Sequence, residues 1–184
     1  MAFVENKYYH LEELSGSDYE IIDGEPNIIG WDVKNEKGQL VGEVDNLLFD
    51  RQSRKVRYIV LDLNSNKLHL DTDRKVLIPI GIAELFRKGG EKQKRDHDKE
   101  DHTYYPDEDG NVVILPEVTI EHLNALPLYE KDHLSPHVER AIRSIFTQKN
   151  KGELPPDTAY SKDEFYRHEH FNDDRFYKGK KDKD

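Results

Sequence analysis

The sequence predicts a mainly β protein: a small β-barrel followed by C-terminal α-helices and a polar tail that contains aromatic residues. Three observations predict this class. Apolar runs of strand length recur within 31–115, and turn residues such as Asp, Asn, Gly and Pro separate them. Two stretches, one from Thr119 to just before Pro127 and one from Ser135, carry helix start signals instead. Beyond Gln148 the chain becomes strongly polar, so we expect the core to lie before it.

The first long strand, residues 40–50, should contain a bend. Its apolar side chains follow even positions up to Val44 and odd positions at Leu47 and Phe49. Because side chains alternate between the two faces of a strand, one extra residue at 45–46 would return them to a common face. We therefore expect a β-bulge there, of the kind that lets a small sheet curl.

The next strand, residues 55–63, is apolar on both faces, because Tyr58 and Val60 alternate with Ile59 and Leu61. A strand that is covered on one side only has a polar outer face. A second layer must therefore cover it, and the sequence leaves three candidates open. These are the C-terminal helices, the N-terminal segment and another subunit.

Two further strands are expected at 74–80 and 111–115. Between them, residues 87–103 contain no aliphatic or aromatic side chain, which predicts a charged loop over 87–107. The three strands that contain Val44, Tyr58 and Ile78 are expected to curl into one closed sheet, with their own side chains filling its interior.

The second predicted helix has the clearer boundaries, because Ser135 suits the N-cap and Pro136 the first helical position. Its apolar residues recur at helical spacing: Val138, Ile142, Ile145 and Phe146. Glu139 lies outside this stripe, so we expect it on the polar face. The stripe itself should pack on the barrel or on a partner.

Composition argues against several classes of function. Charged residues make up 36% of the chain and the formal net charge is -10, which disfavours general binding to nucleic acid or to an anionic membrane. The chain has no cysteine, and no apolar run approaches the ~20 residues of a membrane helix. No nucleophile or phosphate-loop pattern is present. We therefore expect a soluble cytoplasmic protein without catalytic residues or cofactor, which does not bind nucleic acid or insert into a membrane.

Two histidine clusters are candidate metal sites. His97 and His102 lie among acidic residues in the charged loop, and His168 and His170 flank an acidic residue in the tail. Neutral imidazole and carboxylate are ligands for zinc and similar ions. A solvated charged segment is the competing interpretation, because lysine and arginine interrupt the loop cluster and residues two apart point to opposite faces of a strand. We assign no metal on this basis.

Apolar and aromatic side chains supply the candidate interaction surface. Tyr and Phe spaced by charges, as in the tail, are typical anchors of protein interfaces. The tail docks either on its own barrel or on a neighbouring subunit, or it is disordered. The candidate residues come from the strand at 55–63, the second helix and the tail: Ile59, Leu61, Ile142, Phe146, Phe165, Tyr166, Phe171, Phe176 and Tyr177.

Three segments also follow a known family pattern. Residues 38–50 read Gly-Gln-Leu-Val-Gly-Glu-Val-Asp-Asn-Leu-Leu-Phe-Asp, residues 55–62 read Lys-Val-Arg-Tyr-Ile-Val-Leu-Asp, and residues 75–80 read Lys-Val-Leu-Ile-Pro-Ile. In this order they resemble the PRC-barrel family, which pairs G-x-x-(I/V)-G-x-V-x-(D/N)-L-x-(V/F)-D with K-V-R-Y and (V/L)-(L/I)-(I/V)-P. The resemblance covers the chain from Trp31 to Pro127.

The resemblance implies a compact barrel that docks on other proteins. The family includes the cytoplasmic part of the photosynthetic reaction centre H subunit and a ribosome-maturation factor that docks on a ribosomal protein. H subunits have an N-terminal membrane helix, and they have a proton-uptake carboxylate at the corner that here reads Arg51-Gln52-Ser53. Proton conduction by that route is therefore not expected.

The sequence thus predicts a non-enzymatic interaction or regulatory module, resembling the cytoplasmic domain of the H subunit and linked to electron transport or stress regulation. Its partner would be another protein, and both self-association and peripheral docking on a membrane complex fit this interpretation. The alternative is a metal- or pH-responsive protein that uses the histidine-rich loop and tail. The expected divisions are a lead-in, the barrel, a helical segment and a tail: 1–26, 27–128, 129–148 and 149–184.

Overall fold

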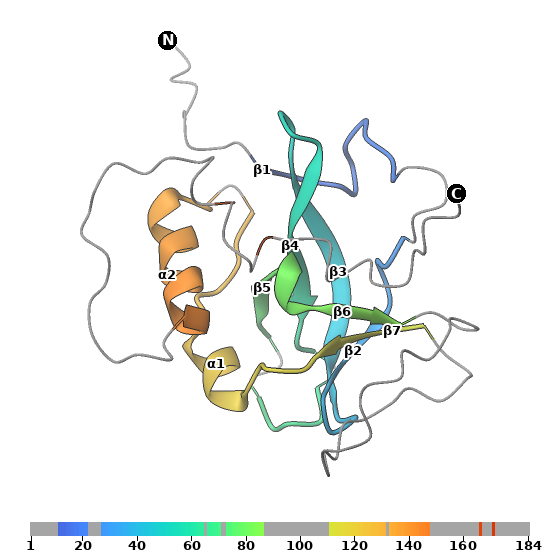
Figure 1. The fold of residues 1–184 in the computed structure, drawn as a ribbon, viewed down its shortest axis with the longest axis vertical. Coiled ribbons are helices and arrows are strands. Elements are labelled where there is room, and N and C mark those ends of the chain that lie inside the picture. The colour runs from blue at the N-terminus through green and yellow to red at the C-terminus, as the bar shows by residue number, and fades with distance from the viewer. Residues whose placement is uncertain are drawn as a thin grey trace, which may run out of the picture.

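The computed structural model describes residues 11–21, 27–64, 66–70, 73–86, 111–131, 133–147, 166 and 171. Within them, seven strands form one sheet in the order β5-β4-β3-β2-β7-β6, and β1 also pairs with β3 (Figure 1). β2 and β7 run parallel, and the other pairs are antiparallel. The strands are β1 (Leu11–Glu13), β2 (Asp32–Asn35), β3 (Leu40–Asp50), β4 (Lys55–Asp62), β5 (Lys75–Pro79), β6 (Glu84–Phe86) and β7 (Val112–Leu115).

The two ends of the sheet, β5 and β6, follow each other in the chain. A short helical turn, η1 (Ile80–Ile82), joins them and buries Ile80. No pairing between β5 and β6 is seen in the described residues. The predicted mainly β, barrel-like fold is confirmed, but the prediction of a closed sheet is wrong. The ladder stops because β5 ends at Pro79, which has no N–H to donate, and because the chain then turns towards β7.

The bulge predicted in β3 is confirmed, since the register with β4 shifts between Val44 and Asn46. Asn46 is buried there, and its Oδ1 accepts hydrogen bonds from the backbone N–H groups of Ser15 (3.1 Å) and Leu47 (2.9 Å). A second shift between Leu48 and Phe49 was not predicted. The bent strand pairs with β2 near its start and with β1 near its end, so it forms the centre of the sheet.

Gly42 allows β3 and β4 to approach closely. A Cβ atom at this position would lie 2.1 Å from the backbone oxygen of Asp62, which is far inside van der Waals contact. The glycine of the first family-like segment therefore has a packing role, because another residue would push the two strands apart.

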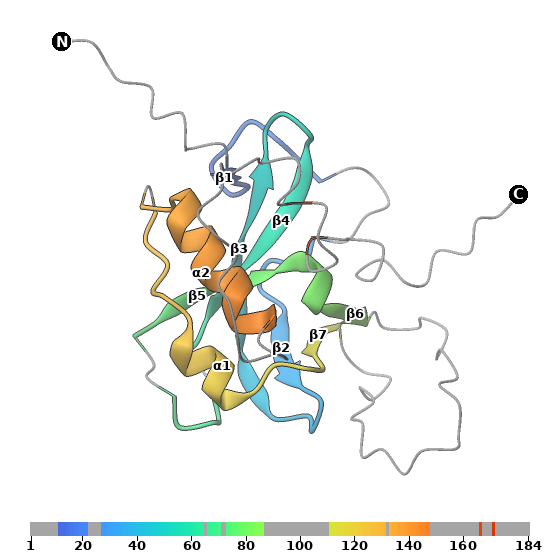
Figure 2. The ribbon, with the colours of Figure 1, turned by 60° about the vertical axis from the view of Figure 1, so that its left-hand side comes forward.

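Both helices lie on the same side of the sheet, beside β5 (Figures 1 and 2). The first, α1 (Ile120–Ala125), begins at Thr119, whose side chain and His122 form a reciprocal capping box. The second, α2 (Pro136–Thr147), begins after Ser135, whose hydroxyl oxygen accepts the N–H of Val138 at 3.3 Å. The helix starts predicted from capping residues are thus confirmed.

The segment between the helices and the sheet is fixed by two long-range hydrogen bonds. The backbone N–H of Tyr129 donates to the oxygen of Lys75 at 2.7 Å, and the Arg74 guanidinium donates to the oxygen of Leu126 at 2.7 Å. These bonds hold the chain after α1 against the start of β5. They place the helices as a second layer over the sheet.

Candidate interaction surface

The aliphatic members of the predicted interaction surface lie in the core. Ile59, Leu61 and Ile142 each expose no more than 1% of their surface. Phe146 is partly buried on α2, and its ring lies 5.4 Å from the imidazole of His122 on α1. These side chains are therefore not open to solvent. On the face of β4 that carries Tyr58, the covering layer includes α2 of the same chain, because the Tyr58 hydroxyl donates to Glu139 on that helix.

The tail contributes two described residues, and both pack on the chain itself. Tyr166 and Phe171 are 6% and 2% exposed and belong to the hydrophobic core cluster. The remaining candidates lie outside the described residues: Phe165, Phe176, Tyr177, His97, His102, His168 and His170.

Glu139 lies at the centre of this contact. It is 1% exposed, and its Oε1 accepts hydrogen bonds from the hydroxyls of Tyr58 on β4, at 3.0 Å, and Tyr166. A buried carboxylate is costly unless hydrogen bonds compensate its lost hydration. The prediction that Glu139 lies on the polar face of α2 is therefore wrong. Helical periodicity separates apolar from polar residues and cannot show that a buried phenol needs an acceptor.

Aromatic rings surround this carboxylate in edge-to-face geometry. The ring of Phe171 lies 5.3 Å from that of Tyr58 at 79°, and 5.0 Å from that of Tyr166 at 83°. The Arg57 guanidinium carbon lies 4.4 Å from the centre of the Tyr166 ring. Such edge-to-face and cation–π contacts each contribute about 0.5–1.5 kcal/mol. We call these five residues (Arg57, Tyr58, Glu139, Tyr166 and Phe171) the Glu139 cluster.

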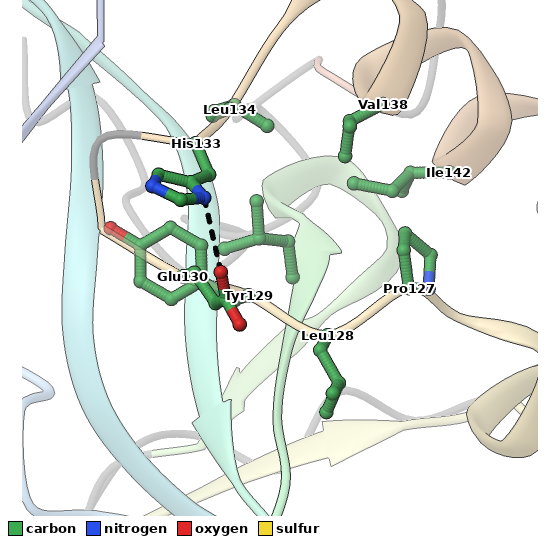
Figure 3. A pocket seen from close by; sticks show the side chains of 9 residues that line it. Pro127, Leu128, Tyr129, Glu130, His133, Leu134, Val138 and Ile142 are labelled. Atoms are coloured by element: carbon green, nitrogen blue, oxygen red, sulfur yellow. Dashed lines mark ion pairs between the residues drawn. The ribbon is translucent and has the colours of Figure 1, made fainter.

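A shallow apolar hollow lies between α2 and the segment that follows α1 (Figure 3). Val138 and Ile142 point into it from α2, and Leu128 stands at its edge with 54% of its surface exposed. Glu130 and His133 form an ion pair of 3.1 Å across its rim. Its volume of about 30 Å³ has room for little more than one water molecule. The hollow is therefore a feature of the surface and not a substrate pocket.

A larger cavity of about 280 Å³ opens beside β1. Its polar wall contains Glu13, which accepts the Tyr129 hydroxyl at 2.8 Å and pairs with Lys131 at 3.3 Å. Leu11, Leu48 and Leu134 line it as well. Because the acid, the phenol and the ammonium group bind one another, this site has the character of a structural contact between β1 and the segment after α1.

Glu121 lies in the first turn of α1. The pKa of Glu121 is lowered, first by a hydrogen bond from its own backbone N–H and then by one from Thr119, as expected for an acid at a helix start. Within the described ranges, no three metal-ligating side chains come together. In the same residues no helix is long and apolar enough to cross a membrane.

The comparison with protein families agrees with the three sequence segments. The model of the PRC-barrel domain matches residues 25–96, which span β2 to β6. No curated protein matches the chain. The matched region contains the bulged β3, the doubly covered β4 and the strand that ends at Pro79. Residues 25–96 therefore match the PRC-barrel domain, and the mainly β fold of the chain is consistent with that family.

Proposed function

We propose that this chain is a non-enzymatic docking module whose helical side binds another protein. Side chains of β3, β4 and β5 form the hydrophobic core, so recognition has to use the outer surface. PRC-barrel domains are known as interaction modules, which supports this class of function. The resemblance to the reaction centre H subunit makes a membrane-bound or electron-transport complex a suitable partner.

The observation that carries the proposal is Leu128 at the edge of the apolar hollow. More than half of this large side chain is exposed, directly beside a depression with walls of Leu134, Val138 and Ile142. A partner side chain that enters the depression would also cover Leu128. Anchors of this kind, surrounded by a polar rim such as Glu130 and His133, are where binding energy concentrates in protein interfaces.

The test compares Leu128→Asp with Ile120→Asp in the full-length chain. Ile120 is a matched control, because it is also an exposed apolar residue (44%) but does not line the hollow. Affinity capture from native lysate should recover a partner with the wild type and the Ile120 variant and lose it with the Leu128 variant. Light scattering at about 100 µM determines whether that partner is a second copy. Equal capture by all three proteins would refute the proposal.

A further inference from the structure

The Glu139 cluster has the parts of a peptide-binding site. Glu139 supplies a buried acceptor for a phenol, Tyr58 supplies an aromatic wall, and Arg57 supplies a cation over a ring. The residues that occupy the site, Tyr166 and Phe171, are five positions apart in the tail. A tyrosine and a phenylalanine with this spacing therefore make the contacts with β4 and α2.

The occupant is joined to the site by a long connection. Residues 148–165 link the end of α2 to Tyr166, and at about 3.3 Å per residue a chain of that length can reach roughly 60 Å. A segment in the same chain has an effective concentration at its site that depends on the length of the connection, and a separate segment with the same motif can compete with it.

The site also has hydrogen-bonding capacity that its occupant does not use. The Nε of Arg57 is a buried donor, and no acceptor lies within reach of it in the described part of the chain. An unpaired buried donor is unfavourable. A bound segment with a carboxylate or carbonyl placed next to its tyrosine would satisfy this donor as well as the contacts now made.

We propose that Arg57, Tyr58 and Glu139 form a docking site for a partner segment that carries Tyr and Phe five residues apart, and that the chain's own tail occupies this site until it is displaced. The site is separate from the hollow at Leu128, so the inference does not rest on the proposed function.

The test uses a fluorescein-labelled peptide with the sequence of residues 160–175 and the full-length protein. By anisotropy, the wild type should bind it weakly because its tail competes. The variant Tyr166→Ala/Phe171→Ala should bind it at least about tenfold more tightly, because its own tail no longer competes well. Replacing the tyrosine that corresponds to Tyr166 in the peptide by phenylalanine should weaken binding by about tenfold, through the lost hydrogen bond to Glu139. A scrambled peptide should not bind.

Two further measurements keep the outcome clear. If the double variant does not fold, Tyr166→Phe removes only one hydroxyl and should still tighten peptide binding several-fold. Leu128→Asp should leave peptide binding unchanged, which separates this inference from the proposed function. Equal binding by the wild type and both tail variants, or equal binding of the scrambled peptide, overturns the proposal. If wild-type copies exchange their tails at micromolar concentration, the displacing segment comes from a second copy of this chain. That result would overturn its assignment to a different protein.

Discussion

Two buried polar residues, Asn46 on β3 and Glu139 on α2, each have an oxygen that accepts two hydrogen bonds, but from different kinds of donor. Asn46 accepts hydrogen bonds from two backbone N–H groups, that of its neighbour Leu47 and that of Ser15, 31 residues away in sequence. Glu139 accepts bonds from side chains 81 and 27 residues away in sequence. The first stabilises the backbone at the bulge of β3 and the segment that follows β1. The second holds a strand, a helix and the tail together, so its loss should affect more of the molecule.

Glu139→Ala should have the largest effect, a loss of about 4 kcal/mol in the free energy of unfolding, because two buried phenols lose the acceptor that they share. Urea denaturation followed by the fluorescence of Trp31 measures it. The control is His137→Ala, an exposed change on the same helix, which should stay within about 0.5 kcal/mol. If the two variants have similar free energies of unfolding, the hydrogen bonds of Glu139 do not hold β4, α2 and the tail together.

Gly42→Ala should follow at about 3 kcal/mol, since its new methyl group would meet the backbone oxygen of Asp62. Gly16→Ala is the matched comparison. Gly16 has open space around it but a φ of +85°, so alanine there should cost only about 1 kcal/mol of backbone strain. Thermal unfolding of both variants compares the cost of a steric clash with the cost of backbone strain. A larger loss of stability in Gly16→Ala than in Gly42→Ala would contradict the close approach of β3 and β4.

Asn46→Ala should cost about 2 kcal/mol, because the N–H groups of Ser15 and Leu47 lose a buried acceptor. The exposed Asn27 makes the same type of bond, to the N–H of Ile29 at 3.1 Å, so Asn27→Ala should cost less than about 0.5 kcal/mol. Hydrogen exchange should show faster exchange at Ser15 and Leu47 in the Asn46 variant. Unchanged exchange there would mean that the bulge persists without its side-chain acceptor.

Lys75→Ala should have the smallest effect, less than about 0.5 kcal/mol. The ion pair joins Asp45, at the bulge of β3, to Lys75 on β5 at 3.0 Å, but the two side chains are 44% and 37% exposed, so water screens the attraction. Urea denaturation at low and high salt checks this. A loss comparable to that of Asn46→Ala would show that charge pairing, and not the amide, stabilises the bulge.

Local rules predicted the local features of this fold. The change of parity after Val44 predicted the bulge, and the capping residues Thr119 and Ser135 predicted both helix starts. Each of these signals lies within a few residues of the feature that it predicts. The apolar second face of β4 also indicated correctly that a covering layer exists.

Features that depend on contacts between segments far apart in the sequence could not be predicted from local rules. The second register shift in β3, the strand β1 and the parallel pairing of β2 with β7 depend on which segments meet in space. The same holds for Glu139, which the pattern of α2 placed on the wrong face. The choice between the helices and another subunit as the cover of β4 was likewise a question of tertiary contact.

The position of β7 determines where this protein can be shortened. β7 lies between β2 and β6 in the sheet, yet residues 112–115 come after the end of the family match at residue 96. A fragment that stops at residue 96 would leave two strands without their shared neighbour, and the backbone groups of β2 that pair with β7 would lose their partners. The smallest unit with an intact sheet therefore extends at least to Leu115, and fragments for biochemical work should be designed from the strand order and not from the family boundary.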